Sequence, residues 1–222
     1  MDSAQAKQAK PRTSASDRIV RDITVGLYEG RFVPGQRLVE PDLMEQYAVS
    51  RPTVREAVQR LAAQGIVDVS HGKSARIRQL SVQEGLNILQ IIEVIVGLAA
   101  RLAAQNIDHP GAQEDLALAL SALMETIASE DRAAFMRARN RFHRTMARIG
   151  GNPDLERILT GMQVHVLRNR LVMPPAERAA SYRRIGEAIA AGDPEAAETA
   201  ARQHVQRMMS ALSAEVPRQA QS

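Results

Sequence analysis

The chain has 222 residues, of which 45% are hydrophobic and none is cysteine. This length can bury one or two hydrophobic cores, and the lack of cysteine excludes disulfides, thiol nucleophiles and thiolate metal sites. The net charge is +4, and the whole excess lies in the first 80 residues, which contain 13 Lys and Arg against 9 Asp and Glu. A basic part joined to a neutral part favours a nucleic-acid binder with a second function attached.

The N-terminal third predicts a disordered tail, three helices and a hairpin. Residues 1–15 are polar and basic and lack the apolar core of a signal peptide, which favours a cytoplasmic protein. The predicted helices cover 17–29 with Ser16 as the cap, a short segment that begins at Glu40-Pro41, and 51–64 with Ser50 as the cap, and strands follow at 66–69 and 75–78. This order is typical of a winged helix-turn-helix, whose third helix contacts base edges in the major groove of DNA.

Two arginines, Arg51 and Arg55, lie four residues apart in the first turns of the third predicted helix, so they share one face. Positive charge near a helix N-terminus is unfavourable by about 0.3–1 kcal/mol. A bidentate contact from Arg to guanine is worth about 1–3 kcal/mol of discrimination, so DNA can offset this cost. The alternative is a solvated arginine face that pairs with Glu56.

The stretch PGQRLVEPDLMEQYAVSRPTVREAVQRLAAQGIVDVSHGK resembles the winged-helix domain of the GntR family of bacterial transcription regulators. The shared pattern is PG-x-RL, then VSR-x-x-VREA-x-x-RL, then a glycine that ends the helix. The resemblance implies DNA contacts from Arg37, Ser50, Arg51, Thr53 and Arg55, and from His71 and Gly72 of the wing. Gly72 permits a close backbone approach, and the neighbouring Lys73 adds a charge that suits phosphate.

The second part of the chain predicts long helices. A capping box at Ser81 and Glu84 begins a helix that runs to about Asn106, and eight of the eleven residues 88–98 are Ile, Leu or Val. Such a helix is buried on more than one side, in a core or in a dimer interface; polar residues interrupt it too often for a membrane span. Further helices are predicted over 111–128, 130–149 with Ser129 as the cap, 153–172, 176–191 and 194–214. The predicted fold is mainly α: a winged helix-turn-helix (three helices plus a β-hairpin) followed by an all-α bundle of about six helices.

The stretches FHRTMARIGGNPDLERIL and YRRIGEAIAAGDPEAAETAARQHV resemble the FCD effector domain of the FadR-like branch of the same family. That resemblance implies a homodimer that binds a small organic acid or a related metabolite inside the bundle. The expected organisation is a disordered tail at 1–15, a DNA-binding domain at 16–80, an effector-binding and dimerisation domain at 81–214 and a second tail at 215–222.

Many FCD domains hold a metal through one Asp and three His, and this chain departs from that pattern. His143 and His204 match two of the histidines, but Arg139 stands in place of the Asp and Tyr182 in place of the middle His. Arginine cannot lose its proton to become a ligand, so these residues disfavour a divalent metal, and no other cofactor is implied. The hypothesis is a metal-free pocket for an anion, lined by Arg139, His143, Tyr182 and His204. One alternative is a metal-dependent sensor that uses His143, His204 and His165. The other is that His143 and His204 are core residues whose hydrogen bonds are satisfied within the protein and that bind no ligand.

These patterns together favour a ligand-responsive transcription regulator. Its predicted partners are a near-palindromic DNA operator, a second copy of the chain and a small organic acid, without a membrane. The family resemblance makes repression the default output. An enzyme that uses His143, Tyr182 and Glu187 is a weaker hypothesis, because no catalytic triad or phosphate loop accompanies these residues. A non-specific nucleoid protein is a further alternative, and the paired arginines argue against it.

Overall fold

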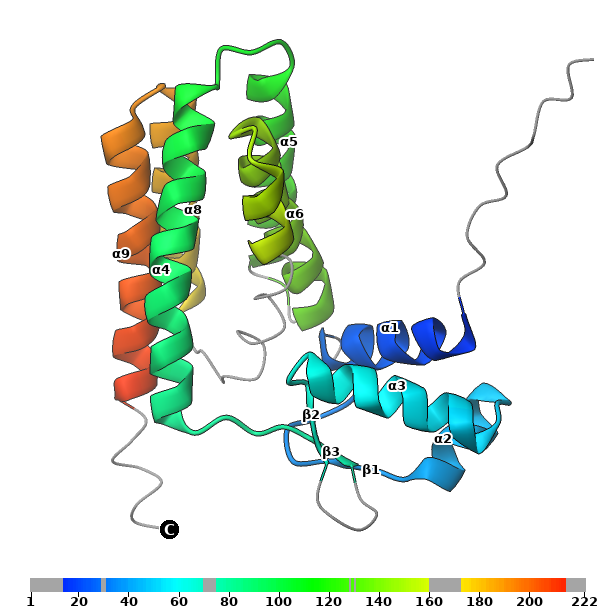
Figure 1. The fold of residues 1–222 in the computed structure, drawn as a ribbon. Helices are drawn as coiled ribbons and strands as arrows, with labels where there is room; N and C mark the ends of the chain where they lie inside the picture. The colour runs from blue at the N-terminus through cyan, green and yellow to red at the C-terminus, as the bar shows by residue number, and fades with distance from the viewer. Residues whose placement is uncertain are drawn as a thin grey trace, which may run out of the picture.

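A computed structural model of the chain describes residues 14–28, 31–69, 75–127, 129, 131–159 and 173–214. Within these residues the buried apolar side chains form two separate clusters, one between Ile19 and Ile77 and one between Leu89 and Leu212. Figure 1 shows the two parts, a small one with a sheet and a larger bundle of long helices. The helix α1 of the small part lies next to α6 of the bundle.

The small part is a winged helix-turn-helix, as predicted. Its elements are α1 (Ala15–Tyr28), β1 (Arg37–Leu38), α2 (Glu40–Tyr47), α3 (Arg51–Ala63), β2 (Val67–Val69) and β3 (Ala75–Ile77). The strands form an antiparallel sheet in the order β1-β3-β2, so β3 pairs with β2 in the predicted hairpin and with β1 on its other side. The prediction did not include β1, because two residues are too few to show an alternating pattern.

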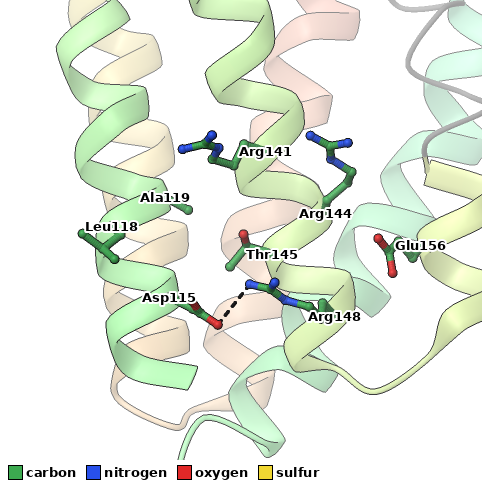
Figure 2. A pocket seen from close by; sticks show the side chains of 8 residues that line it. All are labelled: Asp115, Leu118, Ala119, Arg141, Arg144, Thr145, Arg148 and Glu156. Atoms are coloured by element: carbon green, nitrogen blue, oxygen red, sulfur yellow. Dashed lines mark hydrogen bonds and ion pairs between the residues drawn. The ribbon is translucent and has the colours of Figure 1, made fainter. Parts of the chain in front are cut away.

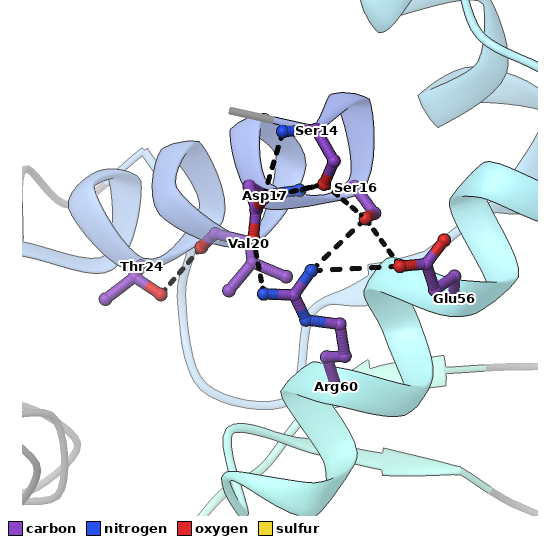
Figure 3. A network of polar contacts seen from close by, with 7 residues as sticks. All are labelled: Ser14, Ser16, Asp17, Val20, Thr24, Glu56 and Arg60. Carbon is purple, nitrogen blue, oxygen red and sulfur yellow. Dashed lines mark hydrogen bonds and ion pairs between the residues drawn. The ribbon is translucent and has the colours of Figure 1, made fainter. Parts of the chain in front are cut away.

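The first helix begins two residues earlier than predicted. Ser14 caps it, since the Ser14 hydroxyl accepts from the backbone N of Asp17 at 3.0 Å and the Asp17 carboxylate accepts from the backbone N of Ser14 at 2.9 Å. The prediction that Ser16 is the cap was wrong. Ser16 is buried and donates to Glu56 Oε1 on α3 at 2.7 Å, while Arg60 donates to both Ser16 and Asp17 (Figure 3). This polar network joins α1 to α3.

The recognition helix α3 has one buried and one exposed face. Its apolar residues Val54, Ala57, Val58 and Leu61 are buried in the same cluster as Ile19 and Ile23 of α1. Its arginines Arg51 and Arg55 are exposed. The helical spacing therefore fixes which side chains face the core and which face outward.

The larger part is an all-α bundle, which also agrees with the prediction. It contains α4 (Val82–Gln105), α5 (Ala112–Ile127), α6 (Arg132–Ile149), α8 (Pro175–Ala190) and α9 (Pro194–Ser213), and residues 153–159 are helical as well. The predicted helix over 153–172 extends beyond the described residues. The predicted capping box of Ser81 and Glu84 is present at the start of α4. Asp131 rather than Ser129 caps α6, because its carboxylate accepts from the backbone N of Ala134 at 2.8 Å.

The helix α4 packs against α9, α6 and α8 and has two apolar faces. One face is buried and includes Leu89, Ile92 and Val96, but Ile91, Val94 and Leu98 on the other face are 54%, 51% and 41% exposed. By length and composition alone α4 would suffice to cross a membrane, yet a core helix of a water-soluble protein meets the same criteria. The expectation was burial on more than one side, in a core or in a dimer interface. One apolar face lies in the core of this chain, and burial of the other face in a dimer interface stays a prediction.

Candidate DNA interface and buried polar site

The two predicted recognition arginines share one carboxylate. Arg51 donates from Nε to Oε2 of Glu40 at 2.9 Å, and Arg55 donates from Nε to Oε1 of Glu40 at 3.1 Å. Glu40 belongs to the first turn of α2. The alternative in which Glu56 neutralises the pair was wrong, because the Glu56 carboxylate faces Ser16 and Arg60 instead. The arginines are thus held side by side at an exposed helix start.

The N-terminus of α3 is open to an anion. Ser50 occupies the predicted N-cap position in an extended conformation, but its side chain caps no backbone amide. The Ser50 hydroxyl is instead 2.9 Å from the hydroxyl of Thr53. The first amides of a helix lack acceptors within the helix and favour negative charge, so this end suits a phosphate of the DNA backbone.

Arg37 lies on the sheet rather than on a helix. In the register of β1 and β3 it stands directly opposite Arg76, and both side chains are exposed. Arg76 donates from Nη1 to the carbonyl oxygen of Gly35 at 3.2 Å. Like charges directly opposite on neighbouring strands are unfavourable, and a phosphate between them would relieve the repulsion. The remaining predicted DNA contacts, His71, Gly72 and Lys73 of the wing, lie outside the described residues.

The four predicted effector residues meet inside the bundle. Arg139 and His143 of α6, Tyr182 of α8 and His204 of α9 are all buried, with 1–4% of each residue exposed. The ring centroids of Tyr182 and His204 are 4.5 Å apart, and those of His143 and Tyr182 are 6.2 Å apart. Helical spacing alone predicted that these side chains point inward, and the fold brings them into one cluster.

The polar atoms of this cluster are incompletely satisfied. His204 Nδ1 is hydrogen-bonded to the Ser181 hydroxyl at 3.0 Å, and Arg139 donates from Nη1 to Oδ1 of Asn140 at 3.2 Å. His143 Nε2 is buried and has no hydrogen-bond partner among the described residues. Among the residues that the structure describes, no Asp or Glu forms a salt bridge with Arg139. A buried polar atom without a hydrogen-bond partner costs free energy, so a ligand that forms a hydrogen bond with it removes that cost.

Burial and positive charge keep the histidines neutral. Burial lowers the pKa of His204 to about 3, and the charges of Arg139, Arg178 and Arg207 lower it in the same direction. Burial likewise lowers the pKa of His143 well below its usual value, with the charge of Arg139 as the second cause. Burial raises the pKa of the Tyr182 hydroxyl, and the charge of Arg139 and a hydrogen bond from it offset part of that rise. The site is therefore a cationic environment built from arginines and neutral rings.

Sequence reasoning missed three members of this environment. Ser181 precedes Tyr182 on α8 and reaches His204, as described above. Arg207 of α9 donates to the same Ser181 hydroxyl at 3.4 Å, and Arg178 of α8 lies over the ring of Phe135 at 4.7 Å. The signal for Arg207 was its position three residues after His204, on the same helix face. Arg178 had no comparable signal in the sequence.

The residues of the cluster do not fit a divalent metal ion. Within the described residues no three His, Asp or Glu side chains lie close enough to hold one. The two neutral histidines share the site with the Arg139 guanidinium and with a phenol whose pKa is raised, and a cation beside them opposes metal binding. His165, the third histidine of the metal alternative, lies outside the described residues.

A second group of arginines lies on the outer surface of α6. Arg141, Arg144 and Arg148 line an open hollow of about 390 Å³ between α5 and α6 (Figure 2). Arg148 pairs with Asp115 of α5 at 3.0 Å (Figure 2), and all three arginines are exposed.

The winged helix-turn-helix, its exposed arginines and the attached all-α bundle are together the architecture of a DNA-binding regulator. Comparison of the sequence with known protein families supports this class. A model of the gntR family of bacterial regulatory proteins matches residues 15–77, and a model of the FCD domain matches residues 87–207. The chain belongs to the gntR family and contains an FCD domain. It is therefore a transcription regulator and not an enzyme, so the enzyme hypothesis was wrong. Glu187, which that hypothesis required, is exposed on α8.

Relatives cover most of the chain. A probable D-xylose utilization operon transcriptional repressor from Paenarthrobacter nicotinovorans is 31% identical over 198 residues, which is 87% of this chain and 87% of the relative. A fatty acid metabolism regulator protein from Shewanella oneidensis is 34% identical over 69% of this chain and 68% of its own length. Among solved structures, E. coli McbR/YncC has a TM-score of 0.77 at 21% identity, covers 92% of this chain and is itself covered completely.

Proposed function

We propose that this protein is a cytoplasmic transcriptional repressor whose operator affinity falls when a small anionic metabolite binds between α6, α8 and α9. The single observation that supports the ligand class best is Arg139, a buried cation without a carboxylate partner among the described residues. Burying a lone cation costs several kcal/mol, on the order of the whole effect of a severe mutation. An anion bound beside Arg139 would offset that cost.

The surroundings of Arg139 point to the same ligand class. Arg178 and Arg207 add positive charge to the site, and each lowers the pKa of His204. Residues 160–172, which lie outside the described structure, contain no Asp or Glu and so cannot supply a carboxylate. The unpartnered His143 Nε2 and the Tyr182 hydroxyl offer hydrogen bonds to a carboxylate or phosphate oxygen.

A physical route connects this site to the DNA interface. The helix α6, which contains Arg139 and His143, contacts α1, and α1 is joined to α3 through Arg60 (Figure 3). A displacement of α6 on anion binding would shift α1 and with it the recognition arginines. The effector then favours a state with lower DNA affinity, which is a population shift.

The proposed DNA target is a near-palindromic operator bound by a homodimer. A two-fold symmetric protein places two recognition helices on two half-sites. The exposed apolar face of α4, with Ile91, Val94 and Leu98, is the proposed dimer surface.

The two separate hydrophobic clusters support a division into a DNA-binding domain at 16–80 and an effector domain at 81–214. Repressor relatives of similar length support repression as the output.

The first experiment measures fluorescence anisotropy of the protein on its own upstream DNA and on a scrambled duplex at physiological salt. Specific binding should exceed binding to scrambled DNA by about a thousandfold, which is a usual specificity ratio. A panel of mono-, di- and tricarboxylates and sugar phosphates is then screened for release of the operator and for a raised melting temperature. Equal affinity for the two duplexes would contradict the proposal that this protein binds a specific operator.

Matched variants locate the effector. Arg139→Met should abolish both responses to the active anion, whereas Arg141→Met, which removes an exposed arginine two residues away on the same helix, should leave them intact. If both variants respond as the wild type does, the buried polar site is not the effector site. Metal analysis of protein purified without chelator tests the metal-sensor alternative, and stoichiometric zinc or nickel would support that alternative.

A further inference from the structure

The carboxylate of Glu40 lies between the two recognition arginines. We propose that Glu40 is a positioning residue of the DNA interface, which holds Arg51 and Arg55 for base contact and so increases sequence specificity while it lowers affinity for DNA in general. This inference rests on the DNA-binding function proposed above. It adds a residue that is not among the predicted DNA contacts.

The hydrogen bonds to Glu40 leave the outer nitrogens of both arginines available. Both bonds start from Nε, at 2.9 Å for Arg51 and 3.1 Å for Arg55. Within the described part of the chain, Nη1 and Nη2 of these arginines make no hydrogen bond. The Nη atoms are the donors that form a bidentate contact with O6 and N7 of guanine. Glu40 therefore holds each guanidinium group through its Nε atom, while the Nη atoms remain available for a contact with DNA.

Glu40 is well placed to act as this fixed point. It lies in the first turn of α2, where the helix dipole favours a carboxylate, and only 23% of its side chain is exposed against 58% for each arginine. It also separates two like charges that would otherwise repel at the start of α3. A long arginine side chain loses rotamer freedom when it binds a base, and a carboxylate that restricts it beforehand reduces that loss.

The same carboxylate opposes general DNA binding. Affinity for any sequence depends on the attraction between cationic side chains and phosphates, and a carboxylate in the interface weakens it. Loss of Glu40 should therefore change two affinities in opposite directions. Affinity for the operator falls because the arginines lose their alignment, and affinity for scrambled DNA rises because one negative charge is gone. A residue that only stabilises the fold would lower both affinities together.

Asp42 offers a matched control for the charge. It is an exposed carboxylate in the same first turn of α2, and no hydrogen bond or salt bridge joins it to Arg51 or Arg55 in the described structure. Asp42→Asn and Glu40→Gln remove the same charge from the same helix turn. Only Glu40→Gln changes the contacts of the recognition arginines.

The experiment compares the full-length wild type, Glu40→Gln and Asp42→Asn on operator and scrambled duplexes by fluorescence anisotropy over a salt series. For Glu40→Gln we expect a loss of operator affinity of about tenfold, from the usual worth of a bidentate contact, and a higher affinity for scrambled DNA. Asp42→Asn should raise both affinities alike. In a background of Arg51→Ala and Arg55→Ala, Glu40→Gln should no longer alter the ratio of the two affinities.

Two results would overturn the inference. One is a Glu40→Gln protein with the wild-type affinity for both duplexes, and the other is an equal loss of affinity on both duplexes, which is the result expected of a residue that only stabilises the fold. A wild type without operator preference would instead contradict the proposed function itself. The failure of each proposal is therefore distinguishable from the failure of the other.

Discussion

Arg78, the residue after β3, donates from Nη2 to Oε1 of Glu84 at 2.6 Å, and Glu84 lies in the first turn of α4. The other oxygen of this carboxylate accepts from the backbone N of Ser81 at 2.9 Å and closes the capping box. The bond from the Ser81 backbone and the bond from Arg78 are the two largest causes that lower the pKa of Glu84 to about 2. One carboxylate thus joins the last strand of the winged helix to the first helix of the bundle.

The two roles of Glu84 are separable by mutation. Ser81→Ala removes the hydroxyl that caps α4 and should lower the free energy of unfolding by about 1 kcal/mol. Glu84→Gln keeps a side chain that can complete a capping box but loses the charge beside Arg78, so its effect should be smaller than that of Ser81→Ala. Urea denaturation at pH 7 measures both. An equal or larger loss in Glu84→Gln would show that the ion pair, not the cap, dominates at this junction.

The buried histidines should make stability depend on pH below neutrality. His143 and His204 are neutral in the folded protein because burial lowers their pKa, for His204 to about 3. In the unfolded chain a histidine titrates near pH 6.5, so below that pH the unfolded chain binds protons that the folded protein excludes. The free energy of unfolding should therefore fall as the pH falls from about 6.5 towards 3, by roughly 1 kcal/mol per pH unit for each buried histidine.

Urea denaturation between pH 6.5 and 5 tests this dependence, because most carboxylates stay ionised in that interval. His204→Gln can keep a hydrogen bond to Ser181 and should reduce the slope by about half, since one of the two neutral histidines is gone. His109→Gln is the control, because His109 is exposed, and it should leave the slope unchanged. An undiminished slope in His204→Gln would assign the dependence to other groups.

Arg139, a buried cation without a carboxylate partner among the described residues, should reduce stability when no ligand is bound. Arg139→Met replaces the guanidinium with an apolar side chain that can fill much of the same space. The free energy of unfolding without ligand should then rise by about 1–3 kcal/mol, because a buried charge without a partner is removed. Arg141→Met, on the exposed side of α6, should change it by less than about 0.5 kcal/mol. If Arg139→Met unfolds more readily than the wild type, the guanidinium is already compensated in the ligand-free protein.

Much of this architecture follows from local patterns, and the exceptions have physical causes. Apolar spacing and the capping box at Ser81 and Glu84 predicted the bundle and the start of its first helix, because both signals lie within a few residues. The cap of α1 was also encoded, since an acidic residue follows Ser14 by three positions and none follows Ser16 in that way. Glu40, in contrast, meets its arginine partners 11 and 15 residues away only because α2 docks on α3. Contacts of that kind depend on packing, which no local pattern specifies.

The facing arginines of the sheet should bind phosphate without reading sequence. Arg76→Gln removes one of two cations that stand opposite each other on β1 and β3, so the free protein should not lose stability. Its affinity should fall alike on operator and scrambled DNA, and the slope of log affinity against log salt should decrease by about 1. Anisotropy titrations at several salt concentrations measure the slope. A selective loss on the operator would mean that Arg76 contacts bases instead.

The exposed apolar face of α4 predicts the dimer interface. Ile91, Val94 and Leu98 repeat at helical spacing and are about half exposed, although their helix also faces the bundle core. Val94→Glu would bury a carboxylate in such an interface, so sedimentation should show a monomer that binds a full operator more weakly. Leu118→Glu is the matched control: Leu118 is a 63% exposed leucine on α5, and its replacement should leave the dimer intact. A Val94→Glu protein that still sediments as a dimer would place the interface on another surface, because a carboxylate at the centre of an apolar contact is not tolerated without a partner.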